Sequence, residues 1–272
     1  MSDQSRKAGV GPVVVKIGGS TLGSHDTTLH DLVTLQKEGV PTVVVHGGGK
    51  VITQWMERQG AVPRFVRGLR VTDQQSLEIV TAVLTGLVNK QLVAALLTMG
   101  ARCIGLSGVD GAILEAELED PELGLVGRVV KVNAKAIQDS LAAGYIPILA
   151  PVGIHVLDGS ANAGGLLNIN GDTATGDIAL ALKASRLVFL TDVEGVMDTS
   201  GRVMPRLSER EVRLLLASGV ASGGMIPKLK ACLRALEAVP ASDIVDGRKP
   251  HSLLDCLADK PLGTRIVGGA GR

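Results

Sequence analysis

The sequence predicts an α/β fold built around a mainly parallel sheet. Short runs of β-branched residues alternate with longer amphipathic segments, which is the pattern of consecutive βαβ units. Several of these runs end in glycine clusters, where the backbone can turn sharply or approach a ligand closely. Hydrophobic residues make up 45% of the 272 residues, which is ample for a large core.

Strands and helices alternate through the first half of the chain. The strands are the short apolar runs, and the helices are the segments whose apolar residues recur at three- and four-residue spacing. Thr72 or Asp73 is expected to cap the longest helix, and Gly100 to end it. We predict strands at 13–17, 41–45, 102–106 and 145–150, a hairpin over 62–72, two or three short strands within 111–131, and helices at 25–38, 50–59, 73–99 and 133–143.

The second half shows the same alternation, and Ser208 is expected to cap the helix that follows it. We predict helices at 172–183, 208–218, 225–238 and near 252–257, strands at 187–190, 243–245 and 264–267, and a hairpin over 195–203. Because no long linker separates the halves, we expect one continuous domain. It comprises a disordered arm over 1–12, a first lobe over 13–167 and a second lobe over 168–272.

Composition argues against several classes of partner. The 28 basic and 27 acidic residues leave a net charge of +1, which gives no electrostatic reason to expect nucleic acid or an anionic membrane. No uninterrupted apolar run reaches about 18 residues, so we expect no membrane span. Residues 1–10 are polar and lack the apolar segment of a secretory signal. The three cysteines are widely spaced, which favours buried thiols in the cytoplasm over disulfides or a metal site.

Glycine clusters follow the first two predicted strands. Lys16 stands just before Gly18 and Gly19, where its charge could reach a phosphate; the alternative is a surface lysine beside an ordinary turn. His46 precedes three consecutive glycines, 47–49, whose amides could form an anion-binding nest at the start of a helix. The alternative for the glycines is a tight turn, and His46 reads as a packed residue at a strand end.

Two further clusters lie in the second half. Asn168 and Asn170 would face the same side of an extended segment. Asp172 follows them as either a helix N-cap or a carboxylate that orients nearby lysines. Lys228 falls in the first turn of a helix after Gly223 and Gly224, where a cation opposes the helix dipole unless an anion such as a nucleotide phosphate compensates. No Cys/His cluster has metal-ligand spacing, so no protein-bound metal is expected.

Taken in order, these segments resemble the amino acid kinase family from Lys16 to Val267. The resemblance implies a three-layer αβα sandwich with a substrate lobe followed by a nucleotide lobe. It rests on Val-Val-Lys-Ile-Gly-Gly (14–19), Val-Val-His-Gly-Gly-Gly (44–49), Gly-Leu-Arg-Val-Thr (68–72), Asn-Lys (89–90), Gly-Leu-Ser-Gly-Val-Asp-Gly (105–111), Asn-Ile-Asn-Gly-Asp (168–172), Leu-Thr-Asp-Val-Glu-Gly-Val (190–196) and Gly-Gly-Met-Ile-Pro-Lys (223–228).

The resemblance also implies roles for individual residues. Lys16 and Lys228 would stabilise the phosphoryl group in transit, and Asp172 would hold both lysines in place. The acylated substrate would contact Gly48, Gly49, Arg70, Asn168 and Asn170. ATP would be lined by Gly18, Gly19, Asp192, Val193, Glu194, Gly195, Val196, Met197, Val220, Ala221 and Ser222, with Mg²⁺ held by its phosphates.

Within the family, the segments are most similar to members that phosphorylate the side-chain carboxylate of N-acetyl-L-glutamate in arginine biosynthesis. A carboxylate with a pKa of about 4.3 is already ionised at pH 7, so this chemistry needs no general base. Lysines, amides and Mg²⁺ then suffice for positioning and electrostatic stabilisation. The alternatives are a kinase for carrier-protein-linked aminoadipate or glutamate, and a non-catalytic amino-acid sensor of the same fold.

The resemblance further implies a homodimer paired through the helix at 73–99, whose apolar residues cover a broader arc than one core-facing stripe requires. Arginine-inhibited relatives carry an N-terminal helix that links dimers into a hexamer. Residues 1–12 lack apolar periodicity, and Cys256 stands where those relatives have a glutamate. We therefore expect a dimer with little inhibition by arginine.

Overall fold

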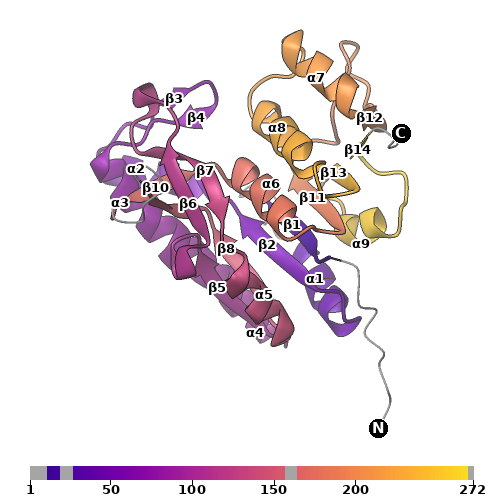
Figure 1. The fold of residues 1–272 in the computed structure, drawn as a ribbon, viewed down its shortest axis with the longest axis horizontal. Helices are drawn as coiled ribbons and strands as arrows, with labels where there is room; N and C mark the ends of the chain where they lie inside the picture. The colour runs from indigo at the N-terminus through magenta and orange to yellow at the C-terminus, as the bar shows by residue number, and fades with distance from the viewer. Residues whose placement is uncertain (1–10, 19–26, 157–163, 269–272) are drawn as a thin grey trace.

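The computed structural model describes residues 11–18, 27–156 and 164–268, and it centres on one eight-stranded sheet (Figure 1). The strands from β13 to β5 run parallel, whereas β14 and β12 run in the opposite direction. In spatial order the sheet contains β12 (Arg206–Ser208), β14 (Thr264–Val267), β13 (Ala241–Asp246), β11 (Arg186–Thr191), β1 (Val13–Ile17), β2 (Thr42–His46), β8 (Ile146–Ala150) and β5 (Cys103–Ser107).

Helices cover both faces of this sheet, and two hydrophobic clusters fill the spaces between the layers. One cluster packs α5 (Lys135–Ala142), α6 (Gly171–Ala181), α7 (Glu209–Ala217) and α8 (Met225–Ala235). The other packs α1 (Thr28–Lys37), α2 (Gly49–Arg58), α3 (Gln74–Thr81), α4 (Asn89–Thr98) and α9 (Ser252–Leu257). The expected three-layer αβα sandwich is therefore confirmed.

Strand alternation sends neighbouring side chains of β1 and β2 to opposite faces of the sheet. Val14 belongs to the α6 and α8 cluster, so Lys16, two residues on, faces that side. Val44 belongs to the cluster that packs α2, α3 and α4, so His46 faces the other side. Residues 17 and 46 are paired in register, which brings the ends of both strands to the same edge.

A smaller sheet lies beside the first lobe of the sandwich. Its strands pair in a closed ring, β10 (Leu166–Ile169), β7 (Val126–Val132), β6 (Leu114–Leu118) and β9 (Val152–His155). The two-stranded hairpin of β3 (Phe65–Val66) and β4 (Leu69–Arg70) stands separately. The sequence predicted the hairpin and the short strands within 111–131, but it did not predict β9, β12 or the ring closure.

The longest helix runs from Gln74 to Thr98, with a π-helical segment, Ala82–Val88, between α3 and α4. Asp73 is its N-cap, since its carboxylate accepts from Ser76 N at 2.8 Å. By length and composition this helix could cross a membrane, but the core helix of a soluble protein meets the same criterion. Eight of its apolar residues (Leu77, Ile79, Val80, Val83, Leu84, Val88, Leu92 and Leu96) are already buried within the protomer.

The other predicted boundaries agree with the structure to within a few residues. Ser208 caps α7 as predicted, and the structure adds a reciprocal capping box with Glu211. α6 begins at Gly171, one residue before its predicted start, and Asn170 is its N-cap, which excludes the N-cap alternative for Asp172. The start of the helix expected at 25–38 and most of the arm at 1–12 lie outside the described residues.

Close packing of α6 on α8 generates a stability prediction. A Cβ added at Gly176 would lie 2.7 Å from Ala231 O and 2.9 Å from its Cα, and backbone atoms cannot move aside cheaply. Gly176→Ala should therefore lower the free energy of unfolding by about 1–3 kcal/mol, measured by urea denaturation. Gly268→Ala is the control, because no atom lies within 4 Å of its added Cβ. Equal stability of both variants would contradict this packing argument.

Candidate active site

A buried carboxylate bridges two lysines at the carboxyl edge of the sheet. Asp172 Oδ1 lies 2.7 Å from Lys16 Nζ, and Asp172 Oδ2 lies 3.0 Å from Lys228 Nζ. The three side chains are only 10%, 8% and 16% exposed, in the order Lys16, Asp172 and Lys228. These residues, separated by more than 200 positions in sequence, thus form one ion triad.

Local structure explains how the triad forms. Asn170 caps α6 by accepting from Asp172 N at 2.9 Å and Thr173 N at 3.1 Å, which frees the Asp172 carboxylate for the lysines. Lys228 lies one turn into α8 and also donates to Gly224 O at 3.2 Å. Burial opposes ionisation of Asp172, but the ammonium groups of Lys16 and Lys228 outweigh it and hold the pKa of Asp172 below its usual value. Asp172 is therefore an ionised bridge between cations.

A cavity of about 190 Å³ opens on the Lys16 side of the triad. Gly48, Gly49, Arg70, Asn168 and Asn170, all predicted substrate contacts, line it together with Lys16 and Asp172. Its apolar wall was not predicted from the sequence and comprises Ile52, Phe65, Leu69, Leu84, Val126, Pro151 and Ile169.

Polar contacts hold the side chains of this cavity in place. The Arg70 guanidinium donates to Thr53 Oγ1 at 2.8 Å and Gly49 O at 3.1 Å, and it stacks 4.7 Å from the centre of the Phe65 ring. Asn168 Nδ2 donates to Thr72 Oγ1 at 2.9 Å. That bond directs the amide hydrogens of Asn168 toward Thr72, which leaves its side-chain carbonyl as the group suited to accept from a ligand.

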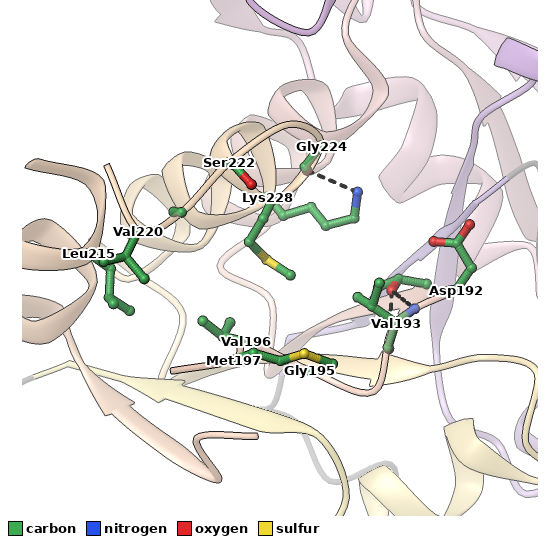
Figure 2. Close-up of a pocket in the computed structure, with 13 residues that line it drawn as sticks. Asp192, Val193, Gly195, Val196, Met197, Leu215, Val220, Ser222, Gly224 and Lys228 are labelled. Carbon is green, nitrogen blue, oxygen red and sulfur yellow. Dashed lines mark hydrogen bonds between the residues drawn. The ribbon is translucent and has the colours of Figure 1, made fainter. Parts of the chain in front are cut away.

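A second cavity, of about 350 Å³, lies on the Lys228 side of the triad (Figure 2). In Figure 2 the Lys228 side chain extends from α8 along one wall, while Val196 and Met197 lie across from it and Leu215 and Val220 lie at one end. Predicted nucleotide residues that line this cavity are Asp192, Val193, Gly195, Val196, Met197, Val220, Ala221 and Ser222.

Some predicted nucleotide contacts do not line that cavity. Gly18 donates its amide to Leu190 O at 3.2 Å, and Glu194 forms an ion pair with Lys249 at 3.0 Å. Gly19 lies outside the described residues. Conversely, Thr191, Leu215, Gly224 and Met225 line the cavity without having been predicted as contacts. Gly224 and Met225 are consecutive at the start of α8, and Thr191 ends β11, so three of these four residues lie within or beside segments that the sequence had singled out, whereas Leu215 in α7 does not.

His46 is fully buried on the opposite face of the sheet from Lys16. Its Nδ1 lies 2.9 Å from Gly47 O, and its Nε2 lies 3.2 Å from Asn89 Nδ2. Burial is the main cause that lowers the pKa of His46 to about 4, so the ring is neutral at pH 7. The prediction that His46 is a packed residue at a strand end is confirmed.

The described part of the chain contains no group of three or more His, Cys, Asp or Glu side chains that could hold a metal ion. Asp172 has an ammonium group on each oxygen, which makes it a poor metal ligand. A divalent ion at this site would therefore depend on ligand atoms of the nucleotide.

The chain is similar to known proteins along nearly its whole length. It is 46% identical over 256 residues to an acetylglutamate kinase of Dehalococcoides mccartyi (strain CBDB1), covering 94% of each chain. It is 44% identical over 259 residues to an acetylglutamate kinase of Cereibacter sphaeroides (strain ATCC 17029), covering 93% and 87%. The solved structure of smu.665 from Streptococcus mutans UA159 superposes with a TM-score of 0.80 at 30% identity, covering 94% and 98%. Since residues 11–242 also match the model of the amino acid kinase family, this chain belongs to that family.

Proposed function

We propose that this protein transfers the γ-phosphoryl group of ATP to the side-chain carboxylate of N-acetyl-L-glutamate, forming an acyl phosphate. The observation that carries the proposal is the ion triad of Lys16, Asp172 and Lys228 between two cavities. The names of relatives at 44–46% identity support the same substrate. On this basis the enzyme acts in arginine biosynthesis in the cytoplasm.

The triad suits a phosphoryl group that passes between the cavities. Lys228 lines the larger cavity and Lys16 the smaller one, so two cations flank the path between them. In a transition state for phosphoryl transfer, negative charge lies on the equatorial, attacking and leaving oxygens, and fixed cations stabilise it. Asp172 prevents the lysines from repelling each other before the anions arrive. The attacking carboxylate is already ionised at pH 7, which agrees with the absence of a poised base among the described residues of the cavity.

The smaller cavity offers the groups that an acylated amino acid requires. The side-chain carbonyl of Asn168 can accept from the acyl amide N–H. Arg70 presents a planar fork for the α-carboxylate, and burial lowers the pKa of its guanidinium without threatening its charge at pH 7. The amides near Gly48 and Gly49 lie at the N-terminus of α2, where the reacting carboxylate or phosphoryl oxygens are stabilised.

The larger cavity fits a nucleotide base. Val196, Met197, Leu215 and Val220 supply apolar walls, and Lys228 stands at the phosphate end near the triad. Mg²⁺ would be carried on the phosphates of ATP and would neutralise part of their charge. The chain's own contribution to phosphate binding is then the two lysines and the nearby backbone amides.

A panel of carboxylic acids tests the substrate. With ATP and Mg²⁺, N-acetyl-L-glutamate should give ADP release well above buffer. Free L-glutamate should be a poor substrate, because a charged ammonium replaces the neutral amide whose N–H donates to the Asn168 carbonyl. Burying that charge costs free energy. L-Aminoadipate is the third arm and represents the alternative kinase. ADP release with acetylglutamate no higher than with buffer would refute the proposal, and turnover of none of the acids would favour a sensor.

Two lysines on α8 provide a matched pair of variants. Lys228→Ala should lower kcat by roughly 10²–10³-fold, because it removes a charged donor at the transferring group. Lys230→Ala should leave kcat unchanged, since Lys230 is exposed on the same helix and is not part of the triad. Steady-state kinetics with both substrates measures the effect. If Lys228→Ala kept near-normal turnover, Lys228 would have no part in phosphoryl transfer.

A homodimer remains part of the proposal, although the apolar residues of the long helix do not require one. The surface that a second copy would cover is a shallow cavity of about 360 Å³ lined by Trp55, Ala82 and Leu87, with Gln59, Gln75 and Glu78 around them. Light scattering should give about twice the 28.1 kDa protomer mass. Leu87→Asp should halve that mass, whereas Val62→Asp, at a residue 81% exposed, should not. A hexamer, or a monomer of the unaltered chain, would contradict the proposal.

A further inference from the structure

A second polar network lies beside the glycine turn, residues 47–49 after β2, on the face of the sheet opposite the ion triad. It begins at Lys90, whose Nζ donates to Asn89 Oδ1 at 3.0 Å. Asn89 Nδ2 donates to Ile148 O at 2.8 Å and reaches His46 Nε2 at 3.2 Å. His46 Nδ1 lies 2.9 Å from Gly47 O. Asn89 and His46 are both fully buried, so water does not complete these contacts.

The partners of His46 fix which ring nitrogen carries the proton. Gly47 O is a carbonyl that can only accept, so Nδ1 must carry the hydrogen. Asn89 Nδ2 is an amide nitrogen that can only donate, so Nε2 must be the bare acceptor. The ring is therefore the neutral Nδ1–H tautomer, and it donates into the first peptide of the glycine turn.

That donation determines where the next amide points. The peptide bonds of the described residues are trans, and in a planar trans peptide the carbonyl and the following N–H point in opposite directions. Drawing Gly47 O toward the buried ring therefore turns the Gly48 N–H away from it, toward the cavity that Gly47, Gly48 and Gly49 line. Among the hydrogen bonds of the described residues at this turn, Gly47 N donates to Ile17 O and Gly48 O accepts from Ile52 N, but none uses the Gly48 N–H.

We infer that His46 and Asn89 are positioning residues that aim the Gly48 amide at the transferring phosphoryl group. Lys90 and the carbonyls of Leu106 and Ile148 hold Asn89, Asn89 fixes the His46 tautomer, and His46 fixes the peptide that carries the donor. His46 itself neither touches substrate nor moves a proton. This role rests on the proposed phosphoryl transfer. It gives the phosphoryl group a backbone donor, the Gly48 N–H, that is oriented independently of the ion triad.

Two substitutions at His46 separate its two hydrogen bonds, because each keeps one bond and removes the other. The side-chain amide of Asn places a donor near the Nδ1 position, so His46→Asn keeps the bond to Gly47 O and loses Asn89. The longer Gln places its carbonyl near the Nε2 position, so His46→Gln keeps Asn89 and loses Gly47 O. His30→Gln is the matched control, because His30 is exposed on α1, away from the glycine turn.

The expected result is a difference in kcat between the two His46 variants. His46→Gln should lower kcat by about 10- to 100-fold with KM for both substrates within about threefold, because a misaimed donor is felt mainly in the transition state. His46→Asn should retain kcat within about fivefold, and His30→Gln should match the unaltered protein. Equal losses in both His46 variants, a loss confined to KM, or normal turnover of His46→Gln would overturn the inference.

A second measurement uses the unaltered protein and does not depend on how the variants fold. Nitrogen NMR of ¹⁵N-histidine-labelled protein at pH 7 should show His46 as the neutral Nδ1–H tautomer. An Nε2–H tautomer or an imidazolium would overturn the inference.

If acetylglutamate is not turned over but another acid of the panel is, the proposed substrate fails while the His46 comparison is made with that acid. If no acid is turned over, phosphoryl transfer fails and the inference is overturned with it.

Discussion

The bridge from Asp172 to Lys16 and Lys228 is the interaction on which the rest of the site depends. Two buried ammonium groups without a counter-ion would repel each other, and their desolvation would cost several kcal/mol. The bridge also joins the two halves of the chain, because Lys16 belongs to β1 while Asp172 and Lys228 begin α6 and α8. Removing Asp172 would therefore disturb charge balance and the packing of both helices on the sheet together.

The order of the strands explains why the cavities meet at this place. β1 lies between β2 and β11, so the chain leaves β1 to one side for the first lobe and returns to its other side for the second. Ligand crevices in open α/β sheets form at such reversals, at the carboxyl ends of the strands. Alternation along β1 and β2 separates the cationic network on one face from the histidine network on the other.

The sequence was informative where a residue's role follows from its own segment. Most strand and helix positions, Ser208 as an N-cap, and the lysines and glycines at the sheet edge were predicted. Roles that depend on contacts with distant segments were not predicted. Nothing local shows that Asn170 would cap α6 in place of Asp172, that Arg70 would be held by Thr53, or that β6, β7, β9 and β10 would close into a ring. The apolar wall of the smaller cavity was missed because its residues converge from many elements.

The π-helical segment at Ala82–Val88 couples two walls of the smaller cavity. It presents Leu84, whose Cδ2 would lie 2.6 Å from a Cβ on Gly48, and it ends where Asn89 reaches His46. Each residue advances a helix by roughly 100°, so losing one residue here would rotate Leu84 and Asn89 relative to each other. The π-helical turn thus fixes the orientation of Leu84, in the apolar wall of the cavity, relative to Asn89, which contacts His46 beside the glycine turn. Helix geometry, as much as side-chain chemistry, fixes the shape that an acyl group would meet.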